Sequence, residues 1–416
     1  MIVLPQMNYT YVIIGGGIAG TTAAQVLREK DPQGSIAIIS EEPHRLYSRI
    51  MLSKRNFFLG IIPFDSVWLK KQEWYEEKKI DFIPNRNVTR ISSNEHVITL
   101  DNGETHSYTK LLIATGGVAR PLTVPGSDLQ GVVYVRTLDD AKNIMEKVKV
   151  TKKVVIIGSG FIGFEMSDLM RSVNAEVTVL IRGPRYWHSL LDESSSTIIE
   201  NAFTTSGVSM RYNVEVKEVR GNDHVEHVVL SDGTTIECDL VMVGIGIVYD
   251  IPWIQESGIE VNKGVIANEY LETSASDIWV AGDIAEFNDT IAGRKVQLGN
   301  WANAQMQGRV AALNMTGERT PFRLVSFYTT HGFDSFIAFA GDVLIQEGSK
   351  ELLRSTANPS SVIRFLCRNS KVVGATLINR TQDLSSVIKM IDTQISIEGK
   401  ESQLEDSSIP LTSFIT

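Results

Sequence analysis

The chain has 416 residues, of which 43% are hydrophobic and 21% charged, and its formal net charge is −9 at pH 7. This composition is typical of a globular enzyme, and the length predicts two or three domains. The negative charge argues against general nucleic-acid binding, and no apolar stretch is long enough to span a bilayer. Because residues 1–6 lack the features of a signal peptide, we expect a cytoplasmic protein.

A glycine-rich turn follows the first apolar run. Residues 11–14 predict a strand, Gly15-Gly16-Gly17-Ile18-Ala19-Gly20 a tight turn, residues 20–30 a helix and residues 35–39 a second strand. One glycine permits the sharp turn, one lets the backbone approach a pyrophosphate, and one lets the helix pack on the strand. The phosphate then lies at the helix N-terminus. Glu41, about 20 residues beyond the turn, stands where an acidic residue meets a ribose hydroxyl, and Glu42 is the substitute.

The pattern is repeated later in the chain. A strand at 111–113 ends in Ala114-Thr115-Gly116, and the proline-containing segment 120–126 predicts a domain crossing. A second turn, Gly158-Ser159-Gly160-Phe161-Ile162-Gly163, follows the apolar run 154–157 and opens another helical pattern. One such turn alone is weak evidence. Two of them predict two bound dinucleotides, and so a flavin that exchanges electrons with a nicotinamide.

The second sheet is predicted to continue through 225–230 and 240–243, and a strand at 278–280 ends in Ala281-Gly282-Asp283. A helical pattern covers 302–314. Beyond Pro321, aromatic and β-branched runs at 327–340 and 362–378 predict a third, α+β domain, and the polar tail after Glu398 is expected to be irregular. The two cysteines, Cys238 and Cys367, are far apart in β-like runs, so we expect buried thiols and no metal site.

Taken together, these motifs resemble the flavoprotein pyridine-nucleotide reductases that have two dinucleotide-binding domains. Residues 111–116 are similar to the family's ATG motif and residues 278–283 to its second flavin motif. Residues 47–54 resemble the Tyr-x-Arg-x-x-Leu-Ser-Lys signature of the ferredoxin and rubredoxin reductases, a branch that includes apoptosis-inducing factor. Here Ile50 and Met51 replace two prolines that are usual in the branch.

The resemblance implies an α/β fold of the glutathione-reductase type, with two Rossmann-like dinucleotide-binding domains and a C-terminal α+β domain. The FAD-binding domain is expected at 8–120 and 246–320. The NAD(P)-binding domain is expected at 121–245, and the C-terminal interface domain at 321–416.

The resemblance also implies a catalytic pair. Lys54 would lie near flavin N5, with Arg49 also close to the flavin, and Lys54 would pair with Glu165, because a buried lysine needs a carboxylate to stay charged. The alternative is a surface lysine and a glutamate that favours the helix dipole. The full set of expected cofactor-binding residues is Gly15, Gly17, Ile18, Ala19, Gly20, Glu41, Glu42, Arg49, Lys54, Val88, Ala114, Thr115, Gly116, Arg120, Gly158, Gly160, Phe161, Ile162, Gly163, Glu165, Arg182, Arg185, Gly246, Gly282, Asp283, Asn300, Trp301 and Ala302.

Some of these residues have specific roles in the family. Asp283 would accept hydrogen bonds from the ribityl chain or act as a helix N-cap, and Val88 would hold the adenine through its backbone. Arg120 would contact the phosphate end of the flavin. Trp301 would lie near the isoalloxazine and the nicotinamide, or else belong to the core. Gly299 stands where the family often has a glutamate, so the sequence does not predict which residue contacts the nicotinamide carboxamide.

The segment after the strand near Ile181 bears on the choice of nicotinamide. NADH-selective members usually carry an acidic residue there, whereas this chain has Arg182 and Arg185, which favour NADPH through its 2′-phosphate or else little discrimination between the two nucleotides. Residues 49–54 contain no cysteine, so the thiol routes of related branches are unavailable.

We therefore expect an FAD-dependent oxidoreductase that takes hydride from NAD(P)H onto flavin N5. It would pass electrons, without a redox disulfide, to ferredoxin, rubredoxin or a small-molecule acceptor. A redox-sensing interaction protein similar to apoptosis-inducing factor and a peroxide-forming oxidase are the alternatives. The resemblance leaves a homodimer open.

Overall fold

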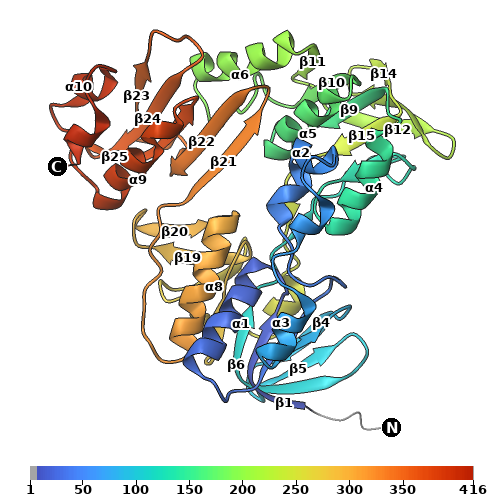
Figure 1. Ribbon diagram of the computed structural model, residues 1–416, viewed down its shortest axis with the longest axis vertical. Coiled ribbons are helices and arrows are strands. Elements are labelled where there is room, and N and C mark those ends of the chain that lie inside the picture. The colour runs from blue at the N-terminus through green and yellow to red at the C-terminus, as the bar shows by residue number, and fades with distance from the viewer. Residues whose placement is uncertain (1–6, 416) are drawn as a thin grey trace. The chain divides into compact units, whose positions relative to one another are not determined.

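A computed structural model describes residues 7–415, which form two compact units (Figure 1). The first unit contains the chain up to Ser48, Asp65–Val118 and Val248–Ser326. The second contains Arg49–Phe64, Ala119–Ile247 and the chain from Phe327 onward. The domain boundaries expected from the sequence stay a prediction.

The sheet of the first unit is built around the long strand β6. The strand order is β3-β2-β1-β6-β5-β4, and β18 also pairs with β6. Residues 105–107 of β6 pair antiparallel with β5, whereas residues 111–113 pair parallel with β18. The strands are β1 (Met7–Ile14), β2 (Ile36–Ile39), β3 (Ile80–Ile83), β4 (Val88–Ser92), β5 (Val97–Leu100), β6 (Thr105–Ile113) and β18 (Ile278–Val280). All of β2 is buried, as expected of a parallel strand covered on both faces.

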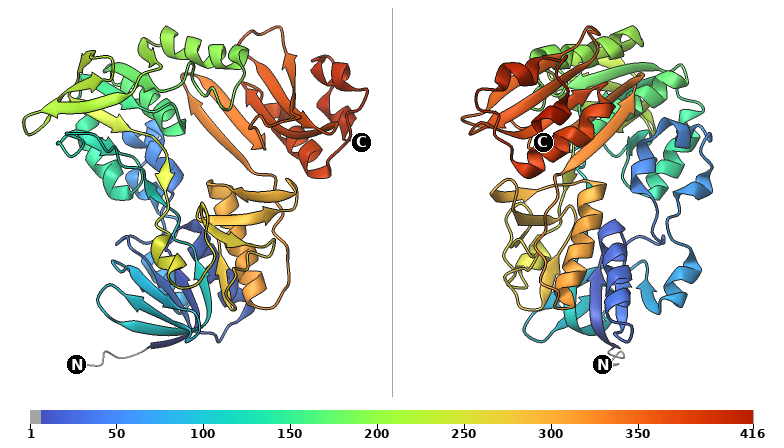
Figure 2. Two further views of the ribbon diagram at one scale, coloured as in Figure 1. Left: turned by 180° about the vertical axis from the view of Figure 1, so that it is seen from behind. Right: turned by 60° about the vertical axis from the view of Figure 1, so that its left-hand side comes forward.

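Two helices of the first unit lie side by side, α1 (Ile18–Lys30) and α8 (Trp301–Met315) (Figure 1 and the right-hand view of Figure 2). Gly308 makes this packing close, because a Cβ built there would lie 2.1 Å from the carbonyl oxygen of Ala19. The remaining elements here are α3 (Gln72–Glu77), α7 (Pro252–Gln255), β17 (Val265–Ala267), β19 (Ala285–Asp289) and β20 (Arg294–Gln297). The chain passes between the units at five points, of which three fall within η2 (Phe64–Val67), β7 (Val118–Ala119) and β16 (Ile247–Val248).

The second unit has a parallel five-stranded sheet in the order β11-β10-β9-β15-β8 and a small meander, β12-β13-β14. The strands are β8 (Val132–Tyr134), β9 (Lys153–Ile157), β10 (Glu176–Ile181), β11 (Val208–Tyr212), β12 (Val216–Gly221), β13 (Val225–Leu230), β14 (Thr235–Glu237) and β15 (Leu240–Val243). Its helices are η1 (Arg49–Ser53), α2 (Arg55–Phe58), α4 (Leu138–Val148), α5 (Phe161–Ser172) and α6 (Glu193–Thr205).

The same unit ends in an antiparallel sheet with the order β21-β22-β25-β24-β23. Its strands are β21 (Phe327–Gly332), β22 (Ser335–Gly341), β23 (Lys350–Ser355), β24 (Val362–Arg368) and β25 (Lys371–Ile378). They are followed by η3 (Thr381–Asp383), α9 (Leu384–Thr393), α10 (Glu401–Glu405) and η4 (Leu411–Phe414). None of the described helices is both long and apolar enough to cross a membrane.

The expectation of an irregular tail was wrong. Residues 401–405 and 411–414 are helical, and Leu404, Leu411 and Phe414 are buried. The buried guanidinium of Arg354 donates to the carbonyl oxygens of Leu404, at 2.9 Å, and Ile409. Three buried apolar side chains and the hydrogen bonds from one buried arginine therefore hold a segment whose overall composition is polar.

A buried histidine predicts acid sensitivity. His106 in β6 is buried, neither ring nitrogen has a hydrogen-bond partner among the described residues, and burial holds its pKa below the usual 6.5. As the pH falls, the unfolded chain therefore takes up the proton first, and the free energy of unfolding decreases below about pH 6.5.

We expect the melting temperature to decrease from pH 7.5 to 5.5, and His106→Leu to reduce that decrease. Differential scanning calorimetry across this range checks it, with the exposed His224→Gln as the matched control. Identical pH dependences for the wild type and His106→Leu would contradict the assignment.

Candidate functional site

The first glycine turn has two positions that only glycine fits. Gly15 has φ +118°, and a Cβ there would lie 2.1 Å from the Ala114 carbonyl oxygen. A Cβ at Gly20 would lie 2.0 Å from the Gly15 carbonyl oxygen. Gly17 differs, because nothing lies within 4 Å of a Cβ built there and no side chain of the described residues caps α1. The helix N-terminus is therefore open to an anion, which fits a dinucleotide phosphate.

The second turn has the same construction. Gly158 has φ +116°, and its added Cβ would lie 2.3 Å from the Gly244 carbonyl oxygen. A Cβ built on Gly163 would lie 2.3 Å from the Gly158 carbonyl oxygen. A Cβ built on Gly160 would have no atom closer than 3.7 Å. The buried Tyr186 hydroxyl donates to the Gly160 carbonyl oxygen at 3.0 Å, a support that no sequence pattern indicated.

Strand register brings three of the expected FAD-binding motifs to one edge of the first unit's sheet. Ile14 of β1 pairs with Ile113 of β6, and Ile113 pairs with Val280 of β18. The residues that follow these strands are the first glycine turn, Ala114-Thr115-Gly116 and Gly282-Asp283. The carboxyl ends of parallel strands are the usual place for a bound nucleotide.

The start of α8 lies against the same motifs. A Cβ built on Gly282 would be 3.4 Å from the Cβ of Ala19 and 3.8 Å from that of Ala304. Asn300 caps α8 by accepting from the Asn303 backbone N–H at 2.9 Å, and its amide donates to Ser326 at 2.8 Å. Trp301 and Ala302, in the first turn of α8, are half-buried.

The two candidate ribose carboxylates have different surroundings. Glu41 is exposed and is the second residue after the end of β2, whereas Glu42 accepts a hydrogen bond from the Tyr47 hydroxyl at 2.6 Å. Val88 is buried at the start of β4.

Three further candidates belong to the second unit. Arg49 donates to the Arg136 carbonyl oxygen at 2.5 Å. The Arg120 backbone N–H donates to the Gly246 carbonyl oxygen at 2.9 Å, which places these two residues together, and the Arg120 side chain is exposed.

Lys54 and Glu165 form an ion pair within the second unit. Lys54 Nζ lies 2.5 Å from Glu165 Oε1, and the carboxylate side chain is only 6% exposed. Glu165 also accepts hydrogen bonds from the Ser53 hydroxyl and, at 2.7 Å, from the Thr330 hydroxyl. Three donors thus compensate the cost of burying this charge. Glu165 lies in the first turn and a half of α5, which begins within the second glycine turn, whereas Lys54 is the N-cap residue of α2.

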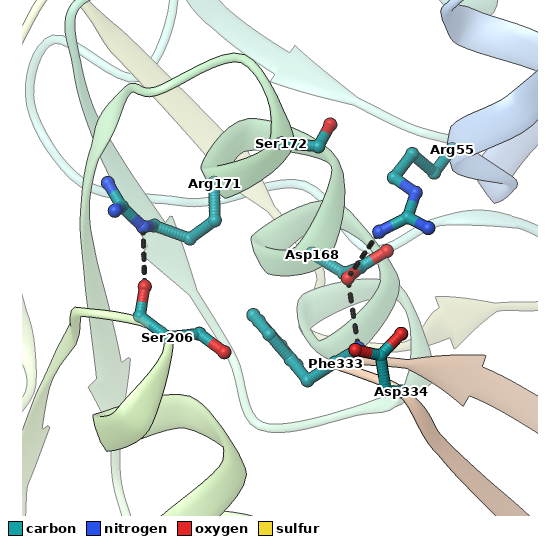
Figure 3. A pocket seen from close by; sticks show the side chains of 7 residues that line it. All are labelled: Arg55, Asp168, Arg171, Ser172, Ser206, Phe333 and Asp334. Atoms are coloured by element: carbon teal, nitrogen blue, oxygen red, sulfur yellow. Dashed lines mark hydrogen bonds and ion pairs between the residues drawn. The ribbon is translucent and has the colours of Figure 1, made fainter.

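A second ion pair lies one helical turn further along α5 (Figure 3). Asp168 Oδ1 is 3.1 Å from Arg55 Nη1 and accepts the Phe333 backbone N–H at 2.9 Å. Sequence reasoning missed this pair, although Asp168 follows Glu165 at the i, i+3 spacing of one helix face and Arg55 follows Lys54.

The arginines after β10 differ in their surroundings. Arg182 is 84% exposed and pairs with Glu215, its Nε lying 2.9 Å from the carboxylate. The loop of Glu215 is held beside β10, because the Asn213 N–H donates to Gly183 and the Val214 N–H to Ile181. Arg185 turns to its own loop and donates weakly to the Leu191 carbonyl oxygen at 3.4 Å.

Both cysteines are buried free thiols, as the sequence predicted. Burial raises the pKa of Cys238 to about 12 and that of Cys367 to about 11. Neither thiol is therefore a nucleophile at neutral pH.

Comparison with known proteins agrees with this geometry. The model of the pyridine nucleotide-disulphide oxidoreductase family matches residues 9–308. The rubredoxin-NAD(+) reductase of Pseudomonas putida is 32% identical over 311 residues, which are 74% of this chain and 80% of that protein.

Solved structures extend the likeness over nearly the whole chain. The ferredoxin reductase for the CYP199A2 system from Rhodopseudomonas palustris has a TM-score of 0.90 and 29% identity, covering 98% of this chain and 100% of that one. The reductase–putidaredoxin covalent complex gives a TM-score of 0.91 at 26% identity, with 99% of each chain covered. The expected architecture of two dinucleotide-binding domains and a C-terminal α+β domain is thereby confirmed. The chain is an oxidoreductase that belongs to the pyridine nucleotide-disulphide oxidoreductase family.

Proposed function

We propose that this oxidoreductase uses NAD(P)H and a bound FAD to reduce a small one-electron carrier protein such as ferredoxin or rubredoxin. The observation that carries the proposal is the ion pair between the partly exposed Lys54 and the buried carboxylate of Glu165. Lys54 belongs to the segment 49–54, which contains no cysteine, and both cysteines of this chain are buried elsewhere. The names of the relatives, a rubredoxin reductase and two reductases of ferredoxin-type carriers, support this choice of acceptor.

We assign FAD to the first glycine turn and the nicotinamide to the second. The open position at Gly17, with Thr115 and Gly282 at the same sheet edge, supports the first assignment. The open position at Gly160 supports the second. When bound, the flavin supplies the chemistry of accepting a hydride and releasing electrons singly. The protein supplies orientation and charge.

In this proposal Lys54 is the residue that tunes the flavin. Its ammonium is held by Glu165, which is itself fixed by Ser53 and Thr330. A cation with a fixed position favours the extra negative charge of a reduced cofactor without reorganisation at the moment of transfer.

Anaerobic stopped-flow reduction by NADH and NADPH, followed at the flavin absorbance band, tests this role. We expect Lys54→Met to slow flavin reduction by about 100-fold, because one preorganised charge is lost. Lys153→Met is the matched control, since it breaks the exposed Lys153–Glu237 pair of the same unit. Equal rates in the wild type and Lys54→Met would refute the role.

Reoxidation of the reduced wild type by ferredoxin or rubredoxin then tests the acceptor. We expect the rate to decrease as ionic strength rises, because exposed charges steer the encounter. A reduced enzyme that reacts with oxygen but with neither carrier would favour a peroxide-forming oxidase. Slow reduction by both nucleotides, with a long-lived complex, would favour a redox sensor.

The FAD assignment makes a separate prediction at the first turn. Gly17→Asp places a carboxylate in open space at the N-terminus of α1, so we expect a folded protein that has lost its FAD through charge repulsion. Gly15→Ala should instead unfold the first unit, because its Cβ would overlap the Ala114 carbonyl. Flavin absorbance and circular dichroism of the purified variants measure both effects. Full flavin content in Gly17→Asp would refute the assignment.

For the nicotinamide, we propose that Arg182 lets the enzyme accept NADPH and that Glu215 limits this preference by pairing with it. Arg182→Gln should lower the ratio of kcat/KM for NADPH to that for NADH, and Glu215→Gln should raise it, each by about tenfold, or ~1.4 kcal/mol. Steady-state kinetics with both nucleotides measure the ratio. An unchanged ratio in both variants would show that these residues do not contact the adenosine end.

A further inference from the structure

Helix α5 carries two buried carboxylates on one face, Glu165 and Asp168, each 6% exposed. Residues three apart on a helix lie on the same side, separated by about 4.5 Å along the axis. Only Glu165 has a role in the function proposed above. Asp168 is therefore a buried charge whose purpose remains to be assigned.

The two carboxylates bind the same two segments of the chain. Glu165 binds Ser53 and Lys54 on one side and Thr330 on the other. Asp168 binds the next residue of the first segment, Arg55, and Phe333 of the second. The contacts of Asp168 thus repeat those of Glu165 one turn later.

The backbone makes Lys54 and Arg55 move together. The Lys54 N–H donates to the Met51 carbonyl oxygen, and the Lys54 carbonyl accepts from the Phe57 N–H, both at 3.0 Å. Lys54 is the N-cap residue of α2, and Arg55 is its first helical residue. If Asp168 moves, the Arg55 side chain that it binds moves with it. We expect this movement to displace the adjacent backbone from which the Lys54 side chain extends.

The second segment is equally constrained. A Cβ built on Gly332 would lie 2.8 Å from a ring carbon of Phe164 and 3.3 Å from the Cβ of Asp168. Strand β21 thus approaches α5 so closely at Gly332 that a larger side chain there would overlap Phe164. The Asp168 carboxylate is bound both by the Phe333 backbone N–H beside this close contact and by the Arg55 guanidinium.

We propose that Asp168 and Arg55 are a positioning pair for Lys54. One ion pair alone, between a flexible lysine and Glu165, would let the 53–55 segment pivot about its contact. The second attachment, one helical turn away, removes that freedom and fixes the direction of the Lys54 ammonium. The contribution of this pair to catalysis rests on the proposed function of Lys54, whereas its effect on the position of Lys54 does not.

A pocket of about 220 Å³ opens beside this pair. Figure 3 shows Arg55 and Asp168 directed toward each other, with Arg171, Ser172, Ser206 and Asp334 around them. The Arg55 side chain is 36% exposed, so small solutes reach its guanidinium. Removing this side chain would leave a space, continuous with the pocket, in which a soluble guanidinium ion can replace it.

Lysine labelling of the FAD-loaded protein tests the positioning directly. We expect Lys54 in Asp168→Asn to react with a small acylating reagent about tenfold faster than in the wild type, as couplings within such networks allow. Peptide mass spectrometry gives the rate for each lysine. Glu165→Gln is the positive control, and Glu237→Gln, which breaks the exposed pair with Lys153, is the negative control. An unchanged Lys54 rate in a folded Asp168→Asn variant would overturn the proposal.

Flavin reduction by NAD(P)H in the same variant separates the two claims. Faster labelling with a lower reduction rate supports the positioning pair and the role of Lys54 together. Faster labelling with an unchanged reduction rate supports the positioning pair and refutes the proposed role of Lys54. Slower reduction with unchanged labelling overturns the positioning proposal, because Asp168 would then act by another route.

Chemical rescue gives an independent measurement. We expect Arg55→Ala to expose Lys54 to labelling, Arg55→Lys to restore part of its protection, and millimolar ethylguanidinium to restore protection to Arg55→Ala but not to Glu165→Gln. Circular dichroism confirms that each variant is folded. If ethylguanidinium protects neither variant and Arg55→Lys labels as fast as Arg55→Ala, the Arg55–Asp168 contact does not position Lys54.

Discussion

The buried carboxylate of Glu165 joins three segments of the second unit. Glu165 has almost no contact with water, so its charge must be compensated within the protein. The compensating donors are Lys54, Ser53 and Thr330, which come from two segments far from α5 in sequence. A buried carboxylate that loses its donors is strongly destabilising, so the cost of leaving the Glu165 charge unpaired opposes separation of these segments.

The glycine turns set the starting point of α5 and therefore the position of this carboxylate. Gly158 and Gly163 allow backbone approaches that no side chain permits, so the first turn of α5 has essentially one placement over β9. Gly15 and Gly20 impose the same placement on α1 in the first unit. In a turn whose glycines let the backbone approach a phosphate, the same glycines pack the helix closely on the strand. The positions of the side chains in the first turns of the helix are fixed as a result.

The sequence predicted the features that depend on local pattern. Both glycine turns, the strands around them and the Lys54–Glu165 pair follow from spacing and family resemblance, and the structure contains that pair. Ser53, Thr330 and the Arg55–Asp168 contact were missed, because a hydrogen-bond donor from a distant segment leaves no periodicity. The tail was misjudged for a related reason. The tail is polar on average, although its Leu404, Leu411 and Phe414 are buried. The cation that binds it, Arg354, lies on strand β23, far away in the sequence.

A family named for disulphide chemistry is represented here by a chain whose two thiols are buried and hard to ionise. Without a covalent thiol step, the protein can influence electron transfer only through binding geometry and electrostatics. The electrostatic effect of a point charge changes with distance, so an ammonium on a flexible four-carbon stem is useful only when its direction is fixed. If Lys54 acts on the flavin as proposed, this requirement accounts for a second buried carboxylate on α5, Asp168, with its own cation and its own backbone donor.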